Sequence, residues 1–241
     1  MEIKTRNRRL RVHKEGYTIL SGLFLLLGLL NLTCWLLLTA GSAQQILLLN
    51  LLLSVIIFLF FLYFFRDPMR QFEIEDDRLV VAPADGRVVA LEPTEVYEYF
   101  EGKKMMQVSI FMSVFNVHAN WYPVDGTVKY LKHYDGSHRA AFLPKSSLEN
   151  EHSTIIIESV GGHRLMMRQI AGALARRIVT YAKPEGAARV NHHCGFIKFG
   201  SRVDIFLPVD SEIFVDLNEH TRGNQTILAR LPKNLLRTNS E

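Results

Sequence analysis

The chain has 241 residues, with 28 Lys and Arg against 24 Asp and Glu, and its pI is about 9.1. This length suits one sizeable domain with additional elements. A basic pI is typical of nucleic-acid-binding proteins, but residues 1–16 alone carry the net charge of +4. Because the excess is confined to this tail, the charge pattern argues against a nucleic-acid partner.

Residues 17–65 contain no Asp, Glu, Lys, Arg or His, and two apolar runs in them flank the polar turn GSAQQ. Each run has about the 20 residues that a helix needs to cross a bilayer core. We therefore predict two transmembrane helices in a hairpin. A cleaved signal peptide is the competing interpretation of the first run, but this run is long for a signal and a second one follows directly. A re-entrant or interfacial hairpin is the remaining alternative.

Basic residues flank both ends of the predicted hairpin, with KTRNRRLRVHK before it and RDPMR after it, whereas the connecting turn is uncharged. The positive-inside rule then places both ends in the cytoplasm. Residues 1–16 are predicted to be a basic cytoplasmic tail. Residues 66–241 are predicted to be a cytoplasmic domain at the cell (inner) membrane.

Short β-forming segments fill the chain after the hairpin. Asp67-Pro68 is predicted to end the second helix, since proline restricts the preceding residue and lacks an N–H donor. The β-forming runs that follow are DRLVVAPADGRVVALEP, MMQVSIFMSV, GTVKYLKHY, HSTIIIESV, HRLMMRQIAG, GFIKFG, RVDIFLP, EIFVDL and QTILARL. This pattern predicts a mainly β, β-rich α+β domain of barrel or sandwich type. The best helix candidate is AGALARRIVTYA at residues 171–182, although RRIVTYA also fits a strand.

Asp85 lies in the motif APADGRVV, between two β-forming runs. Asp-Gly is a common turn pair, so an ordinary turn is one interpretation. The functional alternative is a carboxylate that orients a histidine, as in catalytic triads.

His118 follows an apolar run in FMSVFNVHANWYPVDG. By default it is a half-buried strand residue, and its functional alternative is a general base that takes a proton from a serine hydroxyl. The histidines in polar or turn-like contexts are expected to face solvent; they are His133, His138, His152 and His163.

Cys194 follows His192 and His193, and three adjacent ligand-type residues invite a metal site. They lack the spacing of metal-binding motifs, and no second cysteine pair exists. A structural or surface role for Cys194 is the favoured interpretation, and no metal is predicted.

The stretch FGSRVDIFLP places Gly200-Ser201 in a tight turn between two β-forming runs. It fits an ordinary hairpin corner. It also fits a self-cleavage site, in which the Ser201 hydroxyl attacks the Gly200 carbonyl and shifts the acyl group from nitrogen to oxygen. β-Elimination and hydrolysis would then leave a pyruvoyl group. Glycine before the serine leaves the carbonyl open to attack.

Five motifs together resemble the phosphatidylserine decarboxylases, most of all their short, membrane-anchored, pyruvoyl-dependent form. They are FFRDP, PADGRVV, MSVFNVHAN followed by PVDG, RQIAGALARRIV and FGSRVDIFLP. The resemblance covers essentially the whole chain, and the order and spacing of the motifs make the joint match specific.

The resemblance implies cleavage between Gly200 and Ser201 into a β chain of residues 1–200 and an α chain of residues 201–241. The α chain would begin with a pyruvoyl group made from Ser201. In this family that covalent cofactor forms a Schiff base with phosphatidylserine in the membrane, and the products are phosphatidylethanolamine and CO₂. The pyruvoyl group serves as the electron sink.

One departure from the family pattern concerns the base for self-cleavage. The long-form enzymes carry two histidines spaced H-x-x-H, and the second is assigned to an Asp-His-Ser relay. His118 aligns with the first histidine, and Trp121 stands at the second position. The resemblance thus implies roles for Asp85 and Ser201, and it leaves open whether His118 is the base, a proton donor in decarboxylation, or both.

Substrate contacts are expected from cations, because the lipid headgroup carries a phosphate and a carboxylate. The candidates are Arg168, Arg176, Arg177, Arg202 and, as a hydrogen-bonding group, Gln169. The sequence leaves a homodimer open.

Two other function classes fit parts of the sequence. One is a non-enzymatic, membrane-anchored adaptor with a barrel-sandwich module, suggested by PADGRVVALEP after a hairpin. Such adaptors usually contain coiled-coil heptads, which this chain lacks. The other is a membrane serine hydrolase that uses Ser201, although no G-x-S-x-G motif is present.

Overall fold

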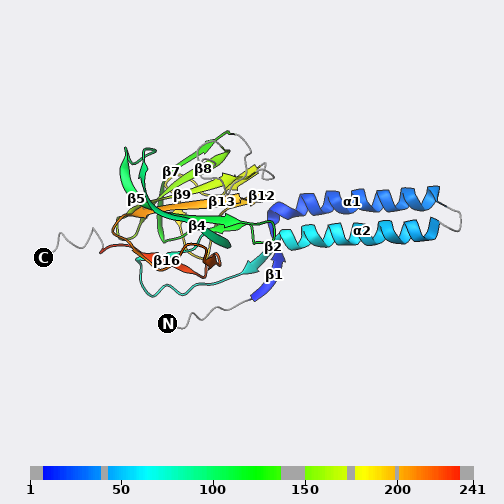
Figure 1. Cartoon of the computed structure of the whole chain (residues 1–241), viewed down its shortest axis with the longest axis horizontal. Helices are drawn as coiled ribbons and strands as arrows, with labels where there is room; N and C mark the ends of the chain where they lie inside the picture. The colour runs from blue at the N-terminus through cyan, green and yellow to red at the C-terminus, as the bar shows by residue number, and fades with distance from the viewer. Residues whose placement is uncertain (1–7, 39–42, 137–149, 173–176, 199–200, 234–241) are drawn as a thin grey trace. The chain divides into compact units, whose positions relative to one another are not determined.

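A computed structural model describes residues 8–38, 43–136, 150–172, 177–198 and 201–233 (Figure 1). The chain divides into two compact units. Arg9–Met69 form one, termed the hairpin unit. Arg70–Glu241, together with Met1–Arg8, form the other, termed the β-domain.

The hairpin unit consists of the helices α1 (Lys14–Leu37) and α2 (Ala43–Phe64), which lie side by side (Figure 1). The strand β1 (Arg8–Val12) precedes α1, and the strand β2 (Arg66–Met69) follows α2. These two strands pair with each other. Both helices are long and apolar enough to cross a membrane, and few of their residues are buried within the structure. Apolar surface of this extent is stable against lipid, so the two helices indicate membrane association.

Three polar side chains link the two helices. Asn31 Nδ2 donates to Ser54 Oγ at 2.9 Å, and Asn50 Nδ2 donates to Asn31 Oδ1 at 2.9 Å. Polar groups in a hydrocarbon environment favour partners on neighbouring helices. These bonds therefore fix which turns of α1 and α2 face each other.

The β-domain is built almost entirely of strands. They are β3 (Leu79–Val81), β4 (Gly86–Val96), β5 (Lys103–Met112), β6 (Ala119–Trp121), β7 (Gly126–Tyr134), β8 (His152–Ser159), β9 (Arg164–Ala171), β10 (Arg177–Thr180), β11 (Ala187–Ala188), β12 (His193–Lys198), β13 (Ser201–Pro208), β14 (Glu212–Ile213), β15 (His220–Thr221) and β16 (Ile227–Arg230).

The strands of the described part of the β-domain form one large sheet and two small ones. The large sheet has the order β11-β7-β8-β9-β13-β5-β4-β15, and the small sheets have the orders β10-β12-β6 and β14-β16-β3. The ladders are antiparallel. The predicted fold class, a transmembrane helical hairpin followed by a β-rich domain, is confirmed.

The helix expected at residues 171–182 is wrong for the part that the structure describes, and the alternative of a strand in RRIVTYA is confirmed there. Arg177–Thr180 form β10, which pairs with β12 from Arg177 opposite Lys198 to Thr180 opposite Gly195. Alanine and arginine favour helix locally, but helix propensity is a weak prior that tertiary pairing overrides. Residues 173–176, including Arg176, lie outside the described residues.

The main hydrophobic core lies on one face of the large sheet, termed the core face. Strand alternation sends Val203, Ile205 and Leu207 of β13 into this core, together with Val108 and Ile110 of β5. The same core includes side chains from the two small sheets. The small sheets therefore pack against the core face of the large sheet, as in a sandwich. The opposite face, termed the polar face, carries the intervening residues of each strand.

Candidate active site

Ser201 is the first residue of β13, near the middle of the large sheet. It lies opposite Met112 of β5 on one side and Ala171 of β9 on the other. Its side chain is fully buried, and its hydroxyl lies 3.3 Å from Met112 Sδ. The hydroxyl therefore points toward the core face, where it donates to the sulfur atom of Met112.

The corner at Gly200-Ser201 does not join a hairpin. β12 pairs with β10 and β6, whereas β13 pairs with β9 and β5, so the chain changes sheets between them. The hairpin interpretation is therefore wrong. Gly200, the predicted partner of Ser201 in cleavage, lies outside the described residues.

A buried chain of amides and hydroxyls extends from the neighbourhood of Ser201. Asn120 Nδ2 contacts Met112 Sδ at 3.7 Å, and Asn120 Oδ1 accepts from Gln169 Nε2 at 2.7 Å. Gln169 Oε1 in turn accepts from Thr180 Oγ1 at 3.0 Å. Asn120, Gln169 and Ser201 are all fully buried. Ser201 thus lies beside polar groups that are uncharged and already hydrogen-bonded.

The sequence pointed to Gln169 but assigned no role to Asn120 or Met112. Gln169 lies opposite Val203 in the ladder of β9 and β13, which places it on the core face with Ser201. Asn120 contacts Gln169 and Met112 from β6, a strand of another sheet. No local pattern in the sequence predicts a contact between side chains of different sheets.

Gly195 makes the Gln169–Asn120 contact possible. A Cβ atom at residue 195 would lie 2.5 Å from Gln169 Nε2 and 2.6 Å from the carbonyl oxygen of Val179. Replacing Gly195 by alanine is therefore expected to displace the Gln169 amide and to lower the free energy of unfolding by about 1–3 kcal/mol, the usual cost of overpacking. Thermal unfolding of the detergent-solubilised protein measures this loss.

Gly22→Ala is the matched control, because a Cβ atom there meets nothing within 4 Å among the described residues. An unfolding temperature for Gly195→Ala equal to that of Gly22→Ala would contradict the proposed close packing of residue 195 against Gln169.

His118 is fully buried, and its surroundings fix its ring. Nδ1 lies 3.0 Å from the carbonyl oxygen of Asn116, and the backbone carbonyl of His118 accepts from Ile197 N at 3.2 Å. Because a carbonyl oxygen only accepts, Nδ1 carries the proton in the neutral ring. Nε2 then keeps a lone pair, as a general base requires.

Asn116 holds the loop before His118 in shape. Its Oδ1 accepts from the backbone N–H of Ser113 at 2.9 Å and from Ser113 Oγ at 2.8 Å. A side chain that bonds nearby backbone in this way stabilises a tight turn. The carbonyl that orients His118 is therefore part of a locally braced loop.

Asp85 is buried in the turn before β4 and is paired with Arg70. Two nitrogens of the Arg70 guanidinium donate to its two carboxylate oxygens, the Nη2–Oδ2 bond measuring 2.9 Å. Asp85 Oδ1 also accepts from the backbone N–H of Gly223 at 2.8 Å. No pattern in the sequence pointed to Arg70 as the partner, because Arg70 and Asp85 belong to segments that only the folded β-domain brings together.

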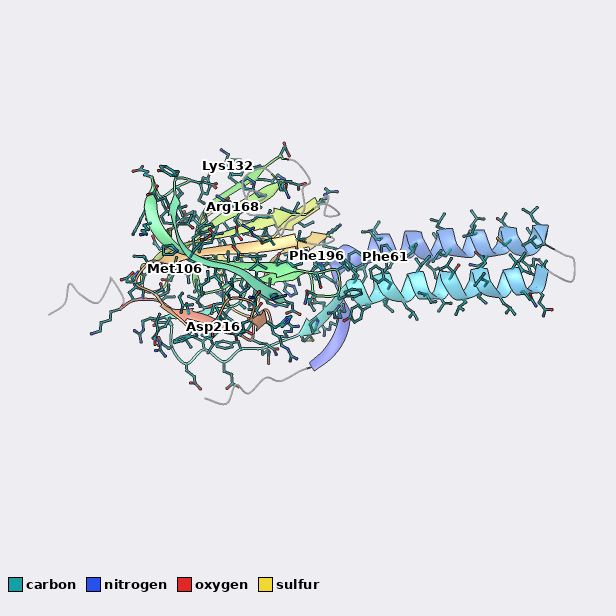
Figure 2. All side chains as sticks on the ribbon, in the orientation of Figure 1. Phe61, Met106, Lys132, Arg168, Phe196 and Asp216 are labelled. Carbon is teal, nitrogen blue, oxygen red and sulfur yellow. The ribbon has the colours of Figure 1, made fainter. Side chains whose placement is uncertain are left out.

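The predicted headgroup arginines occupy two other environments. Arg168 and Arg202 lie on the polar face of the large sheet, opposite to the face of Ser201 and Gln169. Arg168, labelled in Figure 2, donates through Nη2 to Glu98 at 2.6 Å, and Arg202 forms a two-bond pair with Asp204 at 2.7 and 2.9 Å. Arg177 is exposed at the start of β10.

A cavity of about 660 Å³ opens on the polar face. Among its lining residues are Arg168, Arg202, Gln107 and His152. His152 is buried, stacks on Tyr134 with ring centroids 4.6 Å apart, and bonds through Nδ1 to the Asn150 carbonyl at 2.8 Å.

The expectation that the polar-context histidines face solvent is wrong for His152 and His163, which are both buried. His152 is covered by its neighbours in the ladders of β8, where it lies opposite Tyr134 and Ile170. His133 has a side chain that is 45% exposed, in line with the expectation. His138 lies outside the described residues.

Burial lowers the pKa of His152 below its ordinary value, because desolvation disfavours the charged ring. The unfolded chain then binds the proton more readily than the folded one. Stability is therefore expected to fall as the pH drops through about 6.5 toward the lower folded-state pKa. Measuring the unfolding temperature between about pH 7.5 and about pH 5 tests this, because His152→Gln should show a shallower acid-side loss.

The exposed His220 provides the control for this titration. His220→Gln removes an exposed histidine, and so it shows whether the loss of any histidine, as opposed to the buried ring of His152, changes the pH dependence. If the unfolding temperatures of His152→Gln and of the unmodified protein fall equally steeply toward acid pH, His152 does not cause the pH dependence.

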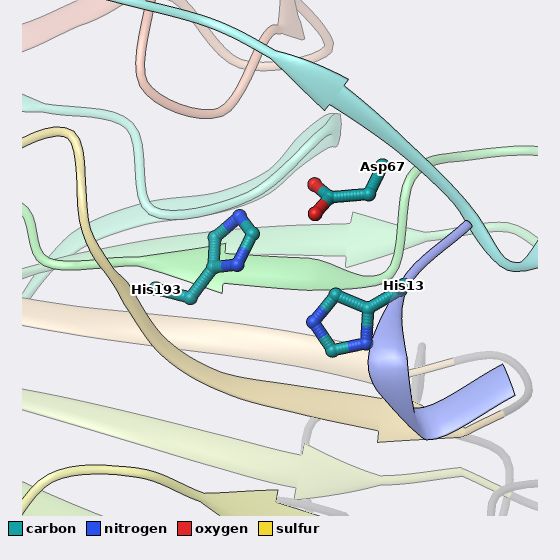
Figure 3. Close-up of side chains that lie close together, drawn as sticks. All are labelled: His13, Asp67 and His193. Carbon is teal, nitrogen blue, oxygen red and sulfur yellow. The ribbon is translucent and has the colours of Figure 1, made fainter. Parts of the chain in front are cut away.

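Three further side chains belong to residue types that bind metals: His13, Asp67 and His193 (Figure 3). His13 precedes α1 and Asp67 lies on β2, both in the hairpin unit, whereas His193 lies on β12 of the β-domain. No single unit holds all three, and we assign no metal site to them. Cys194 packs in the main core, where burial raises the pKa of its thiol, as its structural interpretation predicts.

Comparison with known proteins shows which family the chain is similar to. A family model described as phosphatidylserine decarboxylase matches residues 57–229. A phosphatidylserine decarboxylase proenzyme of Bacteroides fragilis is 48% identical over 224 residues, covering 93% of this chain and 96% of the relative. Its namesake from Parabacteroides distasonis is 49% identical over 224 residues, covering 93% and 100%. A third, from Cytophaga hutchinsonii, is 44% identical over 218 residues, covering 90% and 97%.

Proposed function

The chain belongs to the phosphatidylserine decarboxylase family, and we propose that it converts phosphatidylserine to phosphatidylethanolamine and CO₂. The observation that carries this proposal is the position of Ser201. Its buried hydroxyl lies at the first residue of a central strand, at the point where the chain changes sheets. The relatives are named proenzymes, which supports a self-cleaving precursor here too.

Self-cleavage is proposed at the Gly200–Ser201 bond. Ser201 Oγ attacks the carbonyl carbon of Gly200, and the C–N bond breaks as the ester forms. Loss of the Cα proton of Ser201 then expels the Gly200 carboxylate, and hydrolysis releases the nitrogen as ammonia. The products are a β chain of residues 1–200 and an α chain of residues 201–241 that begins with a pyruvoyl group.

His118 is proposed as the base that accepts the proton of Ser201 Oγ. The bond from Nδ1 to the Asn116 carbonyl places the proton of the neutral ring on Nδ1, so Nε2 is the nitrogen that can accept a proton, and the ring is fully buried. The same ring is proposed to return a proton to the substrate carbon after CO₂ leaves. Asp85, paired with Arg70, is proposed to hold the turn before β4.

The residues around Ser201 suit the small pyruvoyl group that would replace this serine. Met112 and Ala171 flank it on the adjacent strands, and the amides of Asn120 and Gln169 extend the site. When present, a pyruvoyl group supplies an electrophilic carbonyl that draws in the electron pair released with CO₂. Ladders with β5 and β9 hold β13 on both sides, so the new terminus keeps its position after the cut.

Headgroup recognition is proposed to involve Gln169 first, because it shares the core face with Ser201. Arg168, Arg177 and Arg202 stay in the proposal as candidate cations for the phosphate and carboxylate. The structure supports Gln169 more directly, since Arg168 and Arg202 are already paired with carboxylates on the polar face.

The hairpin unit is proposed to anchor the enzyme in the cell (inner) membrane, with the β-domain in the cytoplasm. The two apolar helices support the anchor, and the flanking basic residues support the orientation. An anchored enzyme meets a lipid substrate at a high effective concentration. Family membership disfavours the alternatives of an adaptor and a serine hydrolase.

The test of this function uses the purified full chain and vesicles of phosphatidylserine labelled in the serine carboxyl group. Labelled CO₂ and an equal amount of phosphatidylethanolamine are expected, and phosphatidylcholine vesicles, which lack that carboxyl group, should release none. A preparation with a fully cleaved chain that forms neither product would overturn the proposal.

A further inference from the structure

Arg70 and Asp85 form a buried ion pair, in which both carboxylate oxygens and two guanidinium nitrogens are hydrogen-bonded. Their side chains are 9% and 10% exposed. Both carboxylate oxygens of Asp85 accept from the Arg70 guanidinium, and Oδ1 also accepts from Gly223 N. Two-bond pairing of this kind depends on the planar fork of arginine, which lysine lacks.

The turn that carries Asp85 lies at the same end of the large sheet as Ser201. Arg87 of β4 lies opposite Phe111 of β5, and the next residue of β5, Met112, lies opposite Ser201 of β13. β4, β5 and β13 are neighbours in this order. Since adjacent strands lie about 4.8 Å apart, the Asp85 turn and Ser201 are separated by about 10 Å of backbone. Any influence of Asp85 on Ser201 would therefore pass through the intervening structure.

Arg70 connects this turn to the buried polar chain of the site. Its Nη1 donates to the carbonyl oxygen of Gly223 at 2.8 Å, and its guanidinium carbon lies 5.3 Å from the centre of the Trp121 ring. Trp121 is fully covered and directly follows Asn120, whose amide contacts Met112 and Gln169.

Two further contacts make this cluster rigid. A Cβ atom at Gly223 would lie 2.6 Å from the Trp121 ring, so the backbone of residue 223 packs directly on the indole. The backbone carbonyl of Arg70 accepts from Asn224 Nδ2 at 3.1 Å. Arg70 is thus held by its main chain as well as by its side chain.

We propose that Arg70 is a positioning residue for self-cleavage: its guanidinium binds Asp85, Gly223 and the face of Trp121, and thereby fixes the strand ends around Ser201. Asp85 acts in this arrangement as the fixed anionic partner of Arg70. This inference rests on the proposed function, because it assumes cleavage at Ser201.

The test compares self-cleavage rates of newly made precursor, in membranes, for Arg70→Lys and Arg70→Ala. Both variants should slow cleavage at least about tenfold, because neither restores the two-bond pair. Arg78→Lys is the matched control. Arg78 also pairs with its partner Asp76 through two bonds, but their side chains are 32% and 26% exposed. This variant should cleave at the unmodified rate.

A rescue experiment separates positioning from misfolding. Uncut Arg70→Ala precursor is purified, its folded fraction is measured by thermal unfolding, and guanidinium or methylammonium is added at equal ionic strength. Guanidinium should restore cleavage at least about tenfold over methylammonium, since only guanidinium reproduces the planar fork. A folded precursor that neither cation restores, or that both restore equally, would overturn the proposal.

The two levels of inference fail in different ways. If the unmodified chain releases CO₂ from phosphatidylserine while it remains uncut, the proposed self-cleavage fails. If the unmodified chain is cut and both Arg70 variants are cut at the same rate, only the role of Arg70 fails.

Discussion

Replacing Ser201 by alanine is expected to leave one uncut chain without decarboxylase activity. Alanine lacks the oxygen that attacks the Gly200 carbonyl, so neither the ester nor the pyruvoyl group can form. Without its electron sink, the reaction should return to the uncatalysed rate, a fall of at least about 10⁶-fold. A denaturing gel measures cleavage, and CO₂ release from phosphatidylserine measures activity.

Ser211→Ala is the control for the loss of a buried serine hydroxyl. Ser211 is buried, and its Oγ finds no hydrogen-bond partner among the described residues. Its removal costs no bond, so cleavage and activity should be unchanged. Activity that persists in Ser201→Ala would place the prosthetic group elsewhere in the chain.

Replacing His118 by glutamine is expected to slow self-cleavage about 10²- to 10⁴-fold, the usual contribution of a positioned general base. Glutamine fills much of the space and can donate to the Asn116 carbonyl, but its amide cannot take a proton near neutral pH. The precursor should therefore accumulate in a folded form. Pulse labelling followed by a denaturing gel gives the cleavage rate, and thermal unfolding gives the folded fraction.

His192→Gln is the matched control for this substitution. His192 also bonds through Nδ1 to the carbonyl two residues earlier, at 3.4 Å from Val190, but its side chain is exposed. Its variant should cleave normally. A folded His118→Gln precursor that is cut as fast as His192→Gln would mean that another group takes the proton of Ser201.

The sequence predicted the elements of the fold well because their signals are local. Two long uncharged runs are sufficient for the helical hairpin, and alternation with turn residues is sufficient for most strands. The pairing of strands is not local. The hairpin corner, one of the two interpretations of Gly200-Ser201, was wrong because β12 and β13 find their partners in different sheets.

Alternation along β13 was an unused signal for the site. Neighbouring residues of a strand point to opposite faces, so alternation places Ser201 and Arg202 on opposite faces of the sheet. The Arg70–Asp85 pair and the Gln169–Asn120 bond had no such signal. Each joins segments that only the folded sheets bring together.

The intact masses of the chains in a purified, active preparation test the central claim most directly. The account predicts two chains. The smaller should have the mass of residues 201–241 with a serine terminus, less the mass of one ammonia, and should resist N-terminal sequencing. An active preparation that contains a single chain of 241 residues would contradict the account.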